Sequence, residues 1–333
     1  MPIRPGAGNF AAMLVRRPAG RFVRRLARPI ARILGVPTQA QLKATEDRAE
    51  ARMHDLEDQV LQLVGRQTRL ASDITTLVTR LTDLGTLHQV APLSRWLDHV
   101  QLDDHPLISV ITPTYERVGV LPRAIFSVIG QRYPHWELLV VDDGGVEDSH
   151  RVVEAFADDR IHWMRVEHAG VCAARNAGLR AARGSIVAYL DDDNVMDPGW
   201  LQAVAWAFQH RPDVDVLYGA FVIDDLLRVN GDGSGALPEL FLHPWNRDAL
   251  QRGNLADISA IAHRAGLPGA EFDPSLREMG DWDLLLSLTR ETEPLVLPAV
   301  ACYYTTTAQR RLSGGPTYAA DRARVTARAE SRL

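Results

Sequence analysis

Three consecutive aspartates, Asp191–Asp193, directly follow an apolar run at residues 185–190 that has the composition of a buried strand. Neighbouring carboxylates repel one another and raise each other's pKa unless a cation compensates them. Hard divalent ions such as Mg²⁺ and Mn²⁺ prefer oxygen ligands and leave coordination positions for substrate phosphates. The triplet therefore predicts a metal site that receives a phosphorylated ligand.

An acidic loop before a helix is the alternative interpretation of this segment. Asp197 and Pro198 are a good N-cap and first-turn pair for a following helix. That interpretation accounts for Asp197 but leaves the triplet unexplained.

Polar residues also follow two other apolar runs. The run at residues 107–112 continues into Pro113-Thr114-Tyr115-Glu116, and the run at 136–142 ends in Asp142-Asp143 before two glycines. The chain has no GxxxxGK[ST] phosphate loop, no serine-hydrolase elbow and no HExxH zinc motif. Without a glycine loop for phosphate, a metal ion would have to carry that charge.

Elements of two kinds alternate around these polar segments. Strands are expected at 107–112, 136–142, 161–166 and 185–190, with helices near 120–131, 147–157 and 171–183. Such alternation predicts an α/β core, a mainly parallel sheet with helices on both faces and ligands beyond the carboxyl ends of its strands.

Composition excludes several classes of protein. The 333 residues are 46% hydrophobic and 24% charged, and no apolar run approaches the length of a membrane span. Cys172 and Cys302 lie far apart with no metal-binding spacing, which favours a reducing, cytoplasmic setting over a disulfide or zinc scaffold. The net charge is −5, yet residues 1–45 hold nine basic and no acidic residues, so the body is acidic and unsuited to nucleic acid.

The basic N-terminal arm at residues 1–38 contains an amphipathic segment, FVRRLARPIARIL, that begins at Phe22. Its apolar stripe and arginines would suit the surface of an anionic membrane, with contact through residues 1–35. A solvated, disordered arm is the alternative.

A heptad pattern at residues 41–88, within a segment 39–90, predicts a coiled coil. Leucine dominates the d positions, and Val60 and Ile74 at a positions favour two parallel strands and therefore a homodimer. An amphipathic helix that folds back onto its own domain is the alternative. Residues 91–106 are interpreted as a linker.

Four segments together resemble the family-2 glycosyltransferases of GT-A fold. They are SVITPTYER, LLVVDDGG, AARNAGLRAARGSIVAYLDDDN and FDPSLREMGDWDLLLSL. Each segment alone is a weak signal, but all four in this order are specific for the family. The resemblance covers residues 107–312, with a nucleotide-binding half at 107–224, an acceptor half at 225–312 and a C-terminal tail at 313–333.

The resemblance implies a role for most of the polar residues at the strand ends. Donor binding falls to Pro113, Tyr115, Glu116, Asp142, Asp143, Arg175, Asp191 and Asp192, and metal binding to Asp193 and Asp191. Asp143 would hydrogen-bond the base. The alternatives are that Asp142 only caps its turn and that Arg175 is a solvent-exposed helix residue.

The same resemblance places the catalytic base at Asp281, with Gly280 where the family often has glutamate. The base would take the proton of an acceptor hydroxyl opposite the departing diphosphate, so that the anomeric configuration inverts. Glu278 is a second candidate, and a helix-terminal charge is the structural alternative for Asp281. Some members place a late histidine on the metal, and residues 303–314 have none, so the third metal ligand is unassigned.

These inferences predict an inverting, Mn²⁺- or Mg²⁺-dependent glycosyltransferase. We expect it to move a sugar from a nucleotide-diphosphate donor, with UDP as the expected carrier, to a hydroxyl of a glycan or lipid-linked acceptor in cell-surface polysaccharide or glycoconjugate synthesis. The expected location is the cytoplasm, with peripheral contact to the inner face of the cell membrane. A sugar nucleotidyltransferase and a coiled-coil scaffold with an inactive transferase-like domain are the alternatives.

Overall fold

The computed structural model describes part of the residues between 40 and 69, and then residues 90–97, 99–223, 239–305 and 317–331. The chain divides into two compact units, residues 1–77 and 78–333. The basic arm expected at 1–38 and residues 224–238 lie outside the described residues, as does much of the heptad segment. Within the described part, no helix is both long and apolar enough to cross a membrane.

The described residues of the heptad segment are helical. Met53, Leu56 and Val60, at predicted a and d positions, are 63%, 54% and 55% exposed. Solvent-exposed apolar side chains at these positions are what an unpaired coiled-coil strand would present. Pairing with a second copy stays a prediction.

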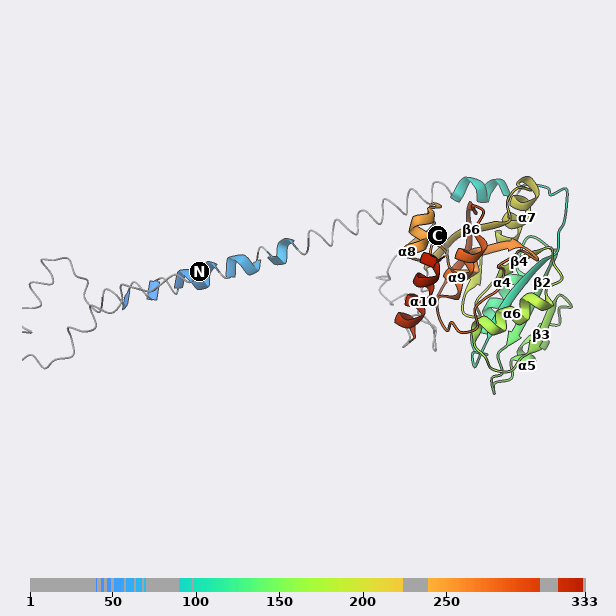
Figure 1. Cartoon of the computed structure of the whole chain (residues 1–333), viewed down its shortest axis with the longest axis horizontal. Helices are drawn as coiled ribbons and strands as arrows, with labels where there is room; N and C mark the ends of the chain where they lie inside the picture. Colours follow the sequence, from blue (N-terminus) through green and yellow to red (C-terminus); the bar gives the residue numbers. More distant parts are fainter. Residues whose placement is uncertain are drawn as a thin grey trace, which may run out of the picture. The chain divides into compact units, whose positions relative to one another are not determined.

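The second unit is built on one mixed sheet flanked by helices (Figure 1). Its strand order is β3-β2-β1-β4-β8-β6-β9-β5, and β7 pairs with β6. The strands are β1 (Ile108–Thr114), β2 (Trp136–Asp142), β3 (Ile161–Arg165), β4 (Ile186–Tyr189), β5 (Val195–Met196), β6 (Val216–Ile223), β7 (Glu239–Phe241), β8 (Ile261–Arg264) and β9 (Leu295–Tyr304). The helices are α4 (Leu121–Ile129), α5 (Ser149–Glu154), α6 (Val171–Ala181), α7 (Trp200–His210), α8 (Arg247–Arg252), α9 (Gly280–Leu288) and α10 (Tyr318–Ser331), with a 3₁₀ turn η1 (Ile258–Ala260). The four strands and three helices expected from the sequence are all present.

The parallel part of the sheet brings the polar strand ends together. β1 pairs in parallel with both β2 and β4, and β2 with β3, whereas β8 runs antiparallel to β4 and β6. The carboxyl ends of β1, β2 and β4 therefore share one edge, which is where ligands bind in open α/β sheets.

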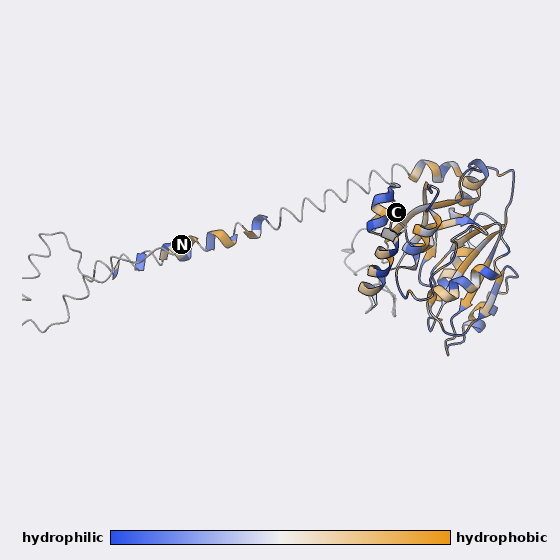
Figure 2. Ribbon diagram, in the orientation of Figure 1, coloured by the Kyte–Doolittle hydropathy of each residue, from blue (hydrophilic) through white to orange (hydrophobic). Residues whose placement is uncertain are grey.

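Helices cover both faces of the sheet, because successive strand residues point to opposite sides. On β1, Ile108 and Val110 join the core formed with α4, α5 and α7, whereas Ile111 joins the core formed with α6, α8, α9 and α10. Figure 2 shows the strands of this unit as largely hydrophobic. The apolar runs of the sequence are continuous because both faces are buried.

The segment expected as a linker, 91–106, is partly built into this unit. Residues 90–97 are helical, and Val90 and Leu97 are only 3% and 2% exposed. Val90 packs near Ala220 and Leu240, and Leu97 joins the core that includes α7. The first part of this segment therefore packs on the sheet unit, because its apolar side chains recur at helical spacing.

The C-terminal segment also contributes to the fold. Within residues 313–333, which are expected to be a tail, α10 packs against α8 and α9. Asp321 is 2% exposed, and its Oδ2 accepts the backbone N–H groups of Arg277 and Glu278 at 2.8 and 2.9 Å. Arg328 contacts Asp273 and Asp283 from the same helix. The helix thus holds the chain immediately before α9.

We expect Asp321→Ala to lower the free energy of unfolding by about 1–3 kcal/mol, because it deprives two backbone N–H groups of their charged acceptor. Chemical denaturation followed by circular dichroism measures the change. Arg322→Ala, at an exposed position on the same helix, is the control and should change stability by less than about 0.5 kcal/mol. Equal effects of the two substitutions would contradict the role of Asp321.

Candidate functional site

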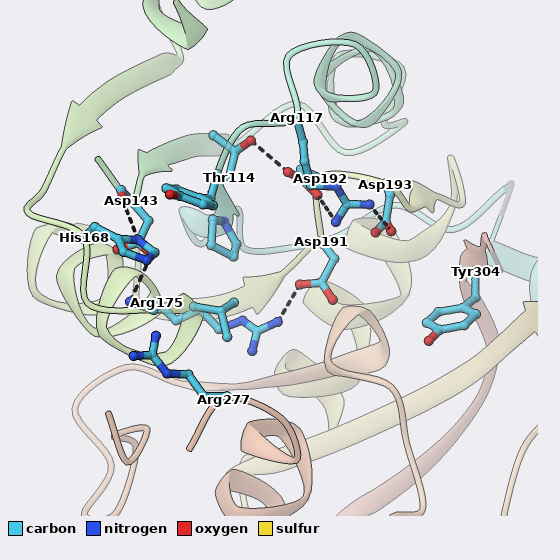
Figure 3. Close-up of a pocket in the computed structure, with 14 residues that line it drawn as sticks. Thr114, Arg117, Asp143, His168, Arg175, Asp191, Asp192, Asp193, Arg277 and Tyr304 are labelled. Carbon is cyan, nitrogen blue, oxygen red and sulfur yellow. Dashed lines mark hydrogen bonds and ion pairs between the residues drawn. The ribbon is translucent and has the colours of Figure 1, made fainter. Parts of the chain in front are cut away.

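A pocket of about 320 Å³ opens at the carboxyl ends of β1, β2 and β4 (Figure 3). Its lining comes from segments far apart in the chain, and most of it is polar or charged. The lining residues are Pro113, Thr114, Tyr115, Arg117, Asp143, His168, Gly170, Val171, Arg175, Asp191, Asp192, Asp193, Arg277 and Tyr304. Of the predicted donor- and metal-binding residues, only Glu116 and Asp142 are not part of this lining.

One end of the pocket carries an aromatic pair beside a carboxylate. The rings of Tyr115 and His168 are stacked with their centroids 4.2 Å apart. Asp143 accepts the backbone N–H groups of Ala169 and Gly170 at 3.0 and 2.9 Å, and His168 Nδ1 lies 2.8 Å from its Oδ2. Gly170, whose N–H donates to Asp143, has a φ of 98°, a value that glycine adopts without steric cost. A flat ring next to a fixed hydrogen-bond acceptor is suited to a nucleobase.

The aspartate triplet forms another part of the pocket wall, and arginines contact all three of its members. Arg117 Nη1 lies 3.0 Å from Asp192 Oδ1, and Arg117 Nη2 lies 2.5 Å from Asp193 Oδ2. Thr114 Oγ1 donates to Asp192 Oδ2 at 2.8 Å. Burial raises the pKa of Asp192 to about 7, against the lowering effect of Arg117. The site therefore holds its negative charge only with the help of nearby cations.

Arg175 supplies the second of these cations. It lies on α6, is 6% exposed and approaches Asp191 Oδ1 to 2.5 Å through its Nη2. Its guanidinium also lies over the ring of Phe272, 5.3 Å from the centroid. The alternative in which Arg175 is a solvent-exposed helix residue is therefore wrong.

Asp142 and Glu116 hold turns beside the pocket. Asp142 Oδ1 accepts the N–H groups of Gly144 and Gly145, and its Oδ2 contacts Ser149 and Arg165. Burial acts to raise the pKa of Asp142, but these hydrogen bonds outweigh it and lower the pKa. The geometry matches the alternative in which Asp142 only caps its turn.

Glu116 plays a similar part in the same turn. Its Oε1 accepts the backbone N–H of Val146, and its own φ is 54°. Its side chain thereby links the segment after β1 to the turn after β2. The sequence order PTYER and the spacing of DDGG did not reveal this contact, because it joins residues 30 positions apart.

Asp281 lies in the first turn of α9, outside the lining of the pocket. Asn254 Nδ2 donates to its Oδ2 at 2.7 Å, and the N–H of Trp282 donates to its Oδ1 at 2.9 Å. Burial raises the pKa of Asp281, with a smaller raising effect from Asp191 and a lowering effect from Arg175. Asp281 is thus electrostatically coupled to the pocket wall.

Close packing at the start of α9 explains the glycine at position 280. A Cβ at Gly280 would lie 2.7 Å from Cys172 Sγ, closer than real contacts allow. The preceding residue, Met279, has a left-handed φ of 62°, which is unusual for a side chain of this kind. The turn that presents Asp281 is therefore tightly constrained.

Glu278, the second candidate base, is occupied elsewhere. It is 7% exposed, and Thr317 Oγ1 donates to its Oε1 at 3.0 Å. Its backbone N–H is one of the two that Asp321 accepts. These contacts favour Asp281 over Glu278 as the residue available to a substrate.

Several residues that line the pocket are not among the site residues predicted from the sequence. They are Thr114, Arg117, His168, Gly170, Val171, Arg277 and Tyr304. Thr114 and Arg117 belong to the PTYER segment, which follows the strand predicted at 107–112. That position is the feature of the sequence that could have identified them as pocket residues. Arg277 and Tyr304 come from the second half of the unit, and no local motif marks them.

Asp257 was also missed. Its Oδ1 accepts the N–H of Ser259 at 2.9 Å, and Ser259 Oγ accepts the N–H of Asp191 at 3.2 Å. Burial raises the pKa of Asp257 to about 7, and Asp191 and Asp281 raise it further. A third carboxylate thus interacts electrostatically with Asp191 and Asp281.

Comparisons with known proteins identify the core of this unit. Residues 109–265 match the model of "Glycosyl transferase family 2". The putative colanic acid biosynthesis glycosyl transferase WcaA of Escherichia coli is 28% identical over 57% of this chain and 68% of its own length.

Two shorter matches are of the same kind. The putative teichuronic acid biosynthesis glycosyltransferase TuaG of Bacillus subtilis is 38% identical over 27% of this chain and 36% of its own length. The UDP-Glc:alpha-D-GlcNAc-diphosphoundecaprenol beta-1,3-glucosyltransferase WfgD of Escherichia coli is 33% identical over 37% of this chain and 48% of its own length. The chain thus spans about a third to two thirds of the length of these relatives.

A solved structure agrees with the fold. S. aureus TarS 1-349, solved in complex with UDP-GlcNAc, superposes with a TM-score of 0.54 at 18% identity, over 68% of this chain and 66% of that one. At this identity the likeness concerns the fold alone, and it confirms the expected GT-A fold. The family match is limited to residues 109–265, and the likeness in fold extends over the unit that contains them.

Proposed function

We propose that this protein transfers a sugar from a nucleotide-diphosphate donor to a hydroxyl acceptor with inversion at the anomeric carbon. The observation that carries the proposal is the pocket itself. It joins an aromatic pair and Asp143 to the aspartate triplet within one cavity of about 320 Å³. The nucleobase of the donor would lie against Tyr115 and His168, and its diphosphate would extend toward Asp193.

A divalent cation fits the donor set only in part. Asp191 and Asp193 offer oxygen ligands on the pocket wall, but the described residues contain no group of three or more acidic, histidine or cysteine side chains placed to hold a metal. Mg²⁺ and Mn²⁺ sites in phosphate-binding proteins commonly use one or two carboxylates and complete their shell with substrate oxygens and water. When bound, such an ion would neutralise charge on the diphosphate leaving group.

Asp281 is proposed as the general base. It belongs to the second half of the unit, and Asn254 fixes its Oδ2 at 2.7 Å. A carboxylate with a raised pKa is a better proton acceptor, once ionised, than one with an ordinary value. Its coupling to Asp191 and Arg175 supports a position facing the donor across the pocket wall.

A UDP-sugar and a lipid-linked or glycan acceptor are the proposed substrates. WfgD, which is 33% identical over 123 residues, carries both UDP-Glc and a diphosphoundecaprenol acceptor in its name. The basic arm would bring the enzyme to an anionic membrane where such acceptors reside. Synthesis of a cell-surface polysaccharide is the corresponding process, in line with the names of WcaA and TuaG.

The two rival functions differ in their products. A sugar nucleotidyltransferase would need a basic, glycine-rich loop for a triphosphate after β1, whereas Arg117 there contacts two aspartates. Incubation of the full chain with Mn²⁺, a panel of nucleotide sugars and candidate acceptors separates the three. Release of a nucleoside diphosphate supports the proposal, release of pyrophosphate supports the nucleotidyltransferase, and no release supports the scaffold.

We expect Asp281→Asn to reduce kcat by about 100- to 10,000-fold, the range over which a general base contributes. UDP binding, measured by calorimetry, should stay within a factor of about three, because Asp281 does not line the pocket. Asp248→Asn is the matched control, since Asp248 is an exposed carboxylate in the first turn of α8. A near-normal rate for Asp281→Asn would remove it from this role.

The pH dependence of the reaction follows from the raised pKa of Asp281. A base acts only when it is deprotonated, so kcat/KM should rise with pH through the pKa of Asp281 and then level off. Because burial raises that pKa, the acidic limb should lie above the ordinary value for aspartate, about 3.9. A profile of kcat/KM against pH measures it, and a flat profile down to that value would exclude Asp281 as the titrating base.

Homodimerisation through residues 41–88 is proposed on the heptad pattern and the exposed a and d side chains. We expect Val60→Glu, at an a position, to convert a dimer to a monomer in light scattering of the full chain. Leu61→Glu is the control, because Leu61 occupies the adjacent b position and is 69% exposed. A monomeric wild type, or a dimer that survives Val60→Glu and deletion of residues 1–77, would contradict the proposal.

A further inference from the structure

Arg117 makes the most consequential contact that sequence analysis did not anticipate. Its guanidinium bridges two carboxylates of the triplet, at 3.0 Å from Asp192 and 2.5 Å from Asp193 (Figure 3). Its side chain is only 16% exposed. A planar guanidinium that binds two carboxylates in this way is a strong, partly desolvated ion pair.

The oxygen that Arg117 contacts is the one a metal would need. Asp193 Oδ2 accepts from Arg117 Nη2, and Asp193 is one of the two residues proposed to bind the metal. A guanidinium and a divalent cation on the same carboxylate would repel each other at a separation of a few ångströms. The two cations therefore compete for this carboxylate.

Arg117 lies outside the helices and strands, unlike the second arginine of the site. Arg175 is part of α6 and lies between Asp191 and the ring of Phe272. Arg117 instead sits in the segment between β1 and α4, next to a turn at residues 118–120, and a Cβ at Gly119 would meet open space. Its Nε is buried with no hydrogen-bond acceptor among the described residues, so part of its donor capacity is unused.

We propose that Arg117 is a built-in competitor of the divalent cation at Asp192 and Asp193, and that it yields this place when a diphosphate arrives. The proposal rests on the proposed function, because it takes a metal and a nucleoside diphosphate as the ligands of the site. A diphosphate offers the guanidinium a new bidentate partner as the metal takes the carboxylates. Arg117 is thus a positioning residue that ties metal binding to donor binding.

The exchange has a thermodynamic consequence. Metal alone must break the ion pair without compensation, so it should bind weakly to the wild type. Metal and nucleotide together exchange one set of charge contacts for another, so each should strengthen the binding of the other by the same factor. Removal of the guanidinium should raise the affinity for metal alone and weaken this coupling.

Titration of the full chain with Mn²⁺, followed by the electron paramagnetic resonance signal of free Mn²⁺, tests the proposal. We expect Arg117→Gln to bind Mn²⁺ without nucleotide at least about tenfold more tightly than the wild type, the factor that a coupling of moderate size produces. Addition of UDP should tighten Mn²⁺ binding more in the wild type than in the variant. Equal or weaker Mn²⁺ binding by Arg117→Gln, or no Mn²⁺ binding by either protein with UDP present, would overturn the proposal.

Two further variants separate competition from general electrostatics and from misfolding. Arg123→Gln removes the same charge from α4, where Arg123 donates to Thr305 Oγ1 at 2.6 Å and makes no ion pair with the triplet, and should leave Mn²⁺ affinity within about threefold of the wild type. Arg117→Lys keeps a charge but lacks the fork, so its affinity should lie between those of the wild type and Arg117→Gln.

The titration is independent of sugar transfer. Tighter Mn²⁺ binding by Arg117→Gln in a protein that releases no nucleoside diphosphate would support Arg117 as the competitor and reject the proposed function. Nucleoside diphosphate release with an unchanged Mn²⁺ affinity in the variant would do the reverse. A thermal melt of each variant identifies any loss of folding. If Arg117→Gln does not fold, the Mn²⁺ affinity of Arg117→Lys relative to the wild type tests the proposal instead.

Discussion

Compensation of buried negative charge is the constraint on which this site depends. Asp192 is 3% exposed, and burial raises its pKa to about 7 against the lowering effect of Arg117. Arg117, from the segment after β1, and Arg175, from α6, contact the three aspartates that follow β4 and compensate their charge. These ion pairs join the segment after β1, helix α6 and the segment after β4, so the contacts that compensate charge also hold the walls of the pocket together.

The proposed base depends on a second set of contacts, at the start of α9. Gly280 leaves room for the Sγ of Cys172, and Asn254 holds the Asp281 carboxylate. Asp321 anchors the backbone just before this turn from the C-terminal helix. The part of the unit that ends with β6 and the part that carries Asp281 therefore meet through α6, because Cys172 and Arg175 both belong to that helix.

Residues adjacent in sequence have separate tasks in the structure. Asp143 faces the pocket, whereas Asp142 accepts the amides of the following turn, although Asp142 ends β2 and Asp143 directly follows it. Side chains alternate across a strand, so neighbours must face different surroundings. The resemblance to family 2 implies donor binding by both residues. Only the hydrogen bonds in the structure distinguish Asp143, which lines the pocket, from Asp142, which holds the turn beside it.

The amino-acid sequence by itself determined the strands, the helices that alternate with them and the polar residues at the strand ends, because hydrophobic periodicity is a local property of the chain. It could not place Arg117 on Asp193, 76 residues away, or Asp321 on the turn before α9. Such contacts depend on strand order and register, which bring distant segments together. Tertiary structure alone decided which cation neutralises which carboxylate, because that choice is made by distance in space.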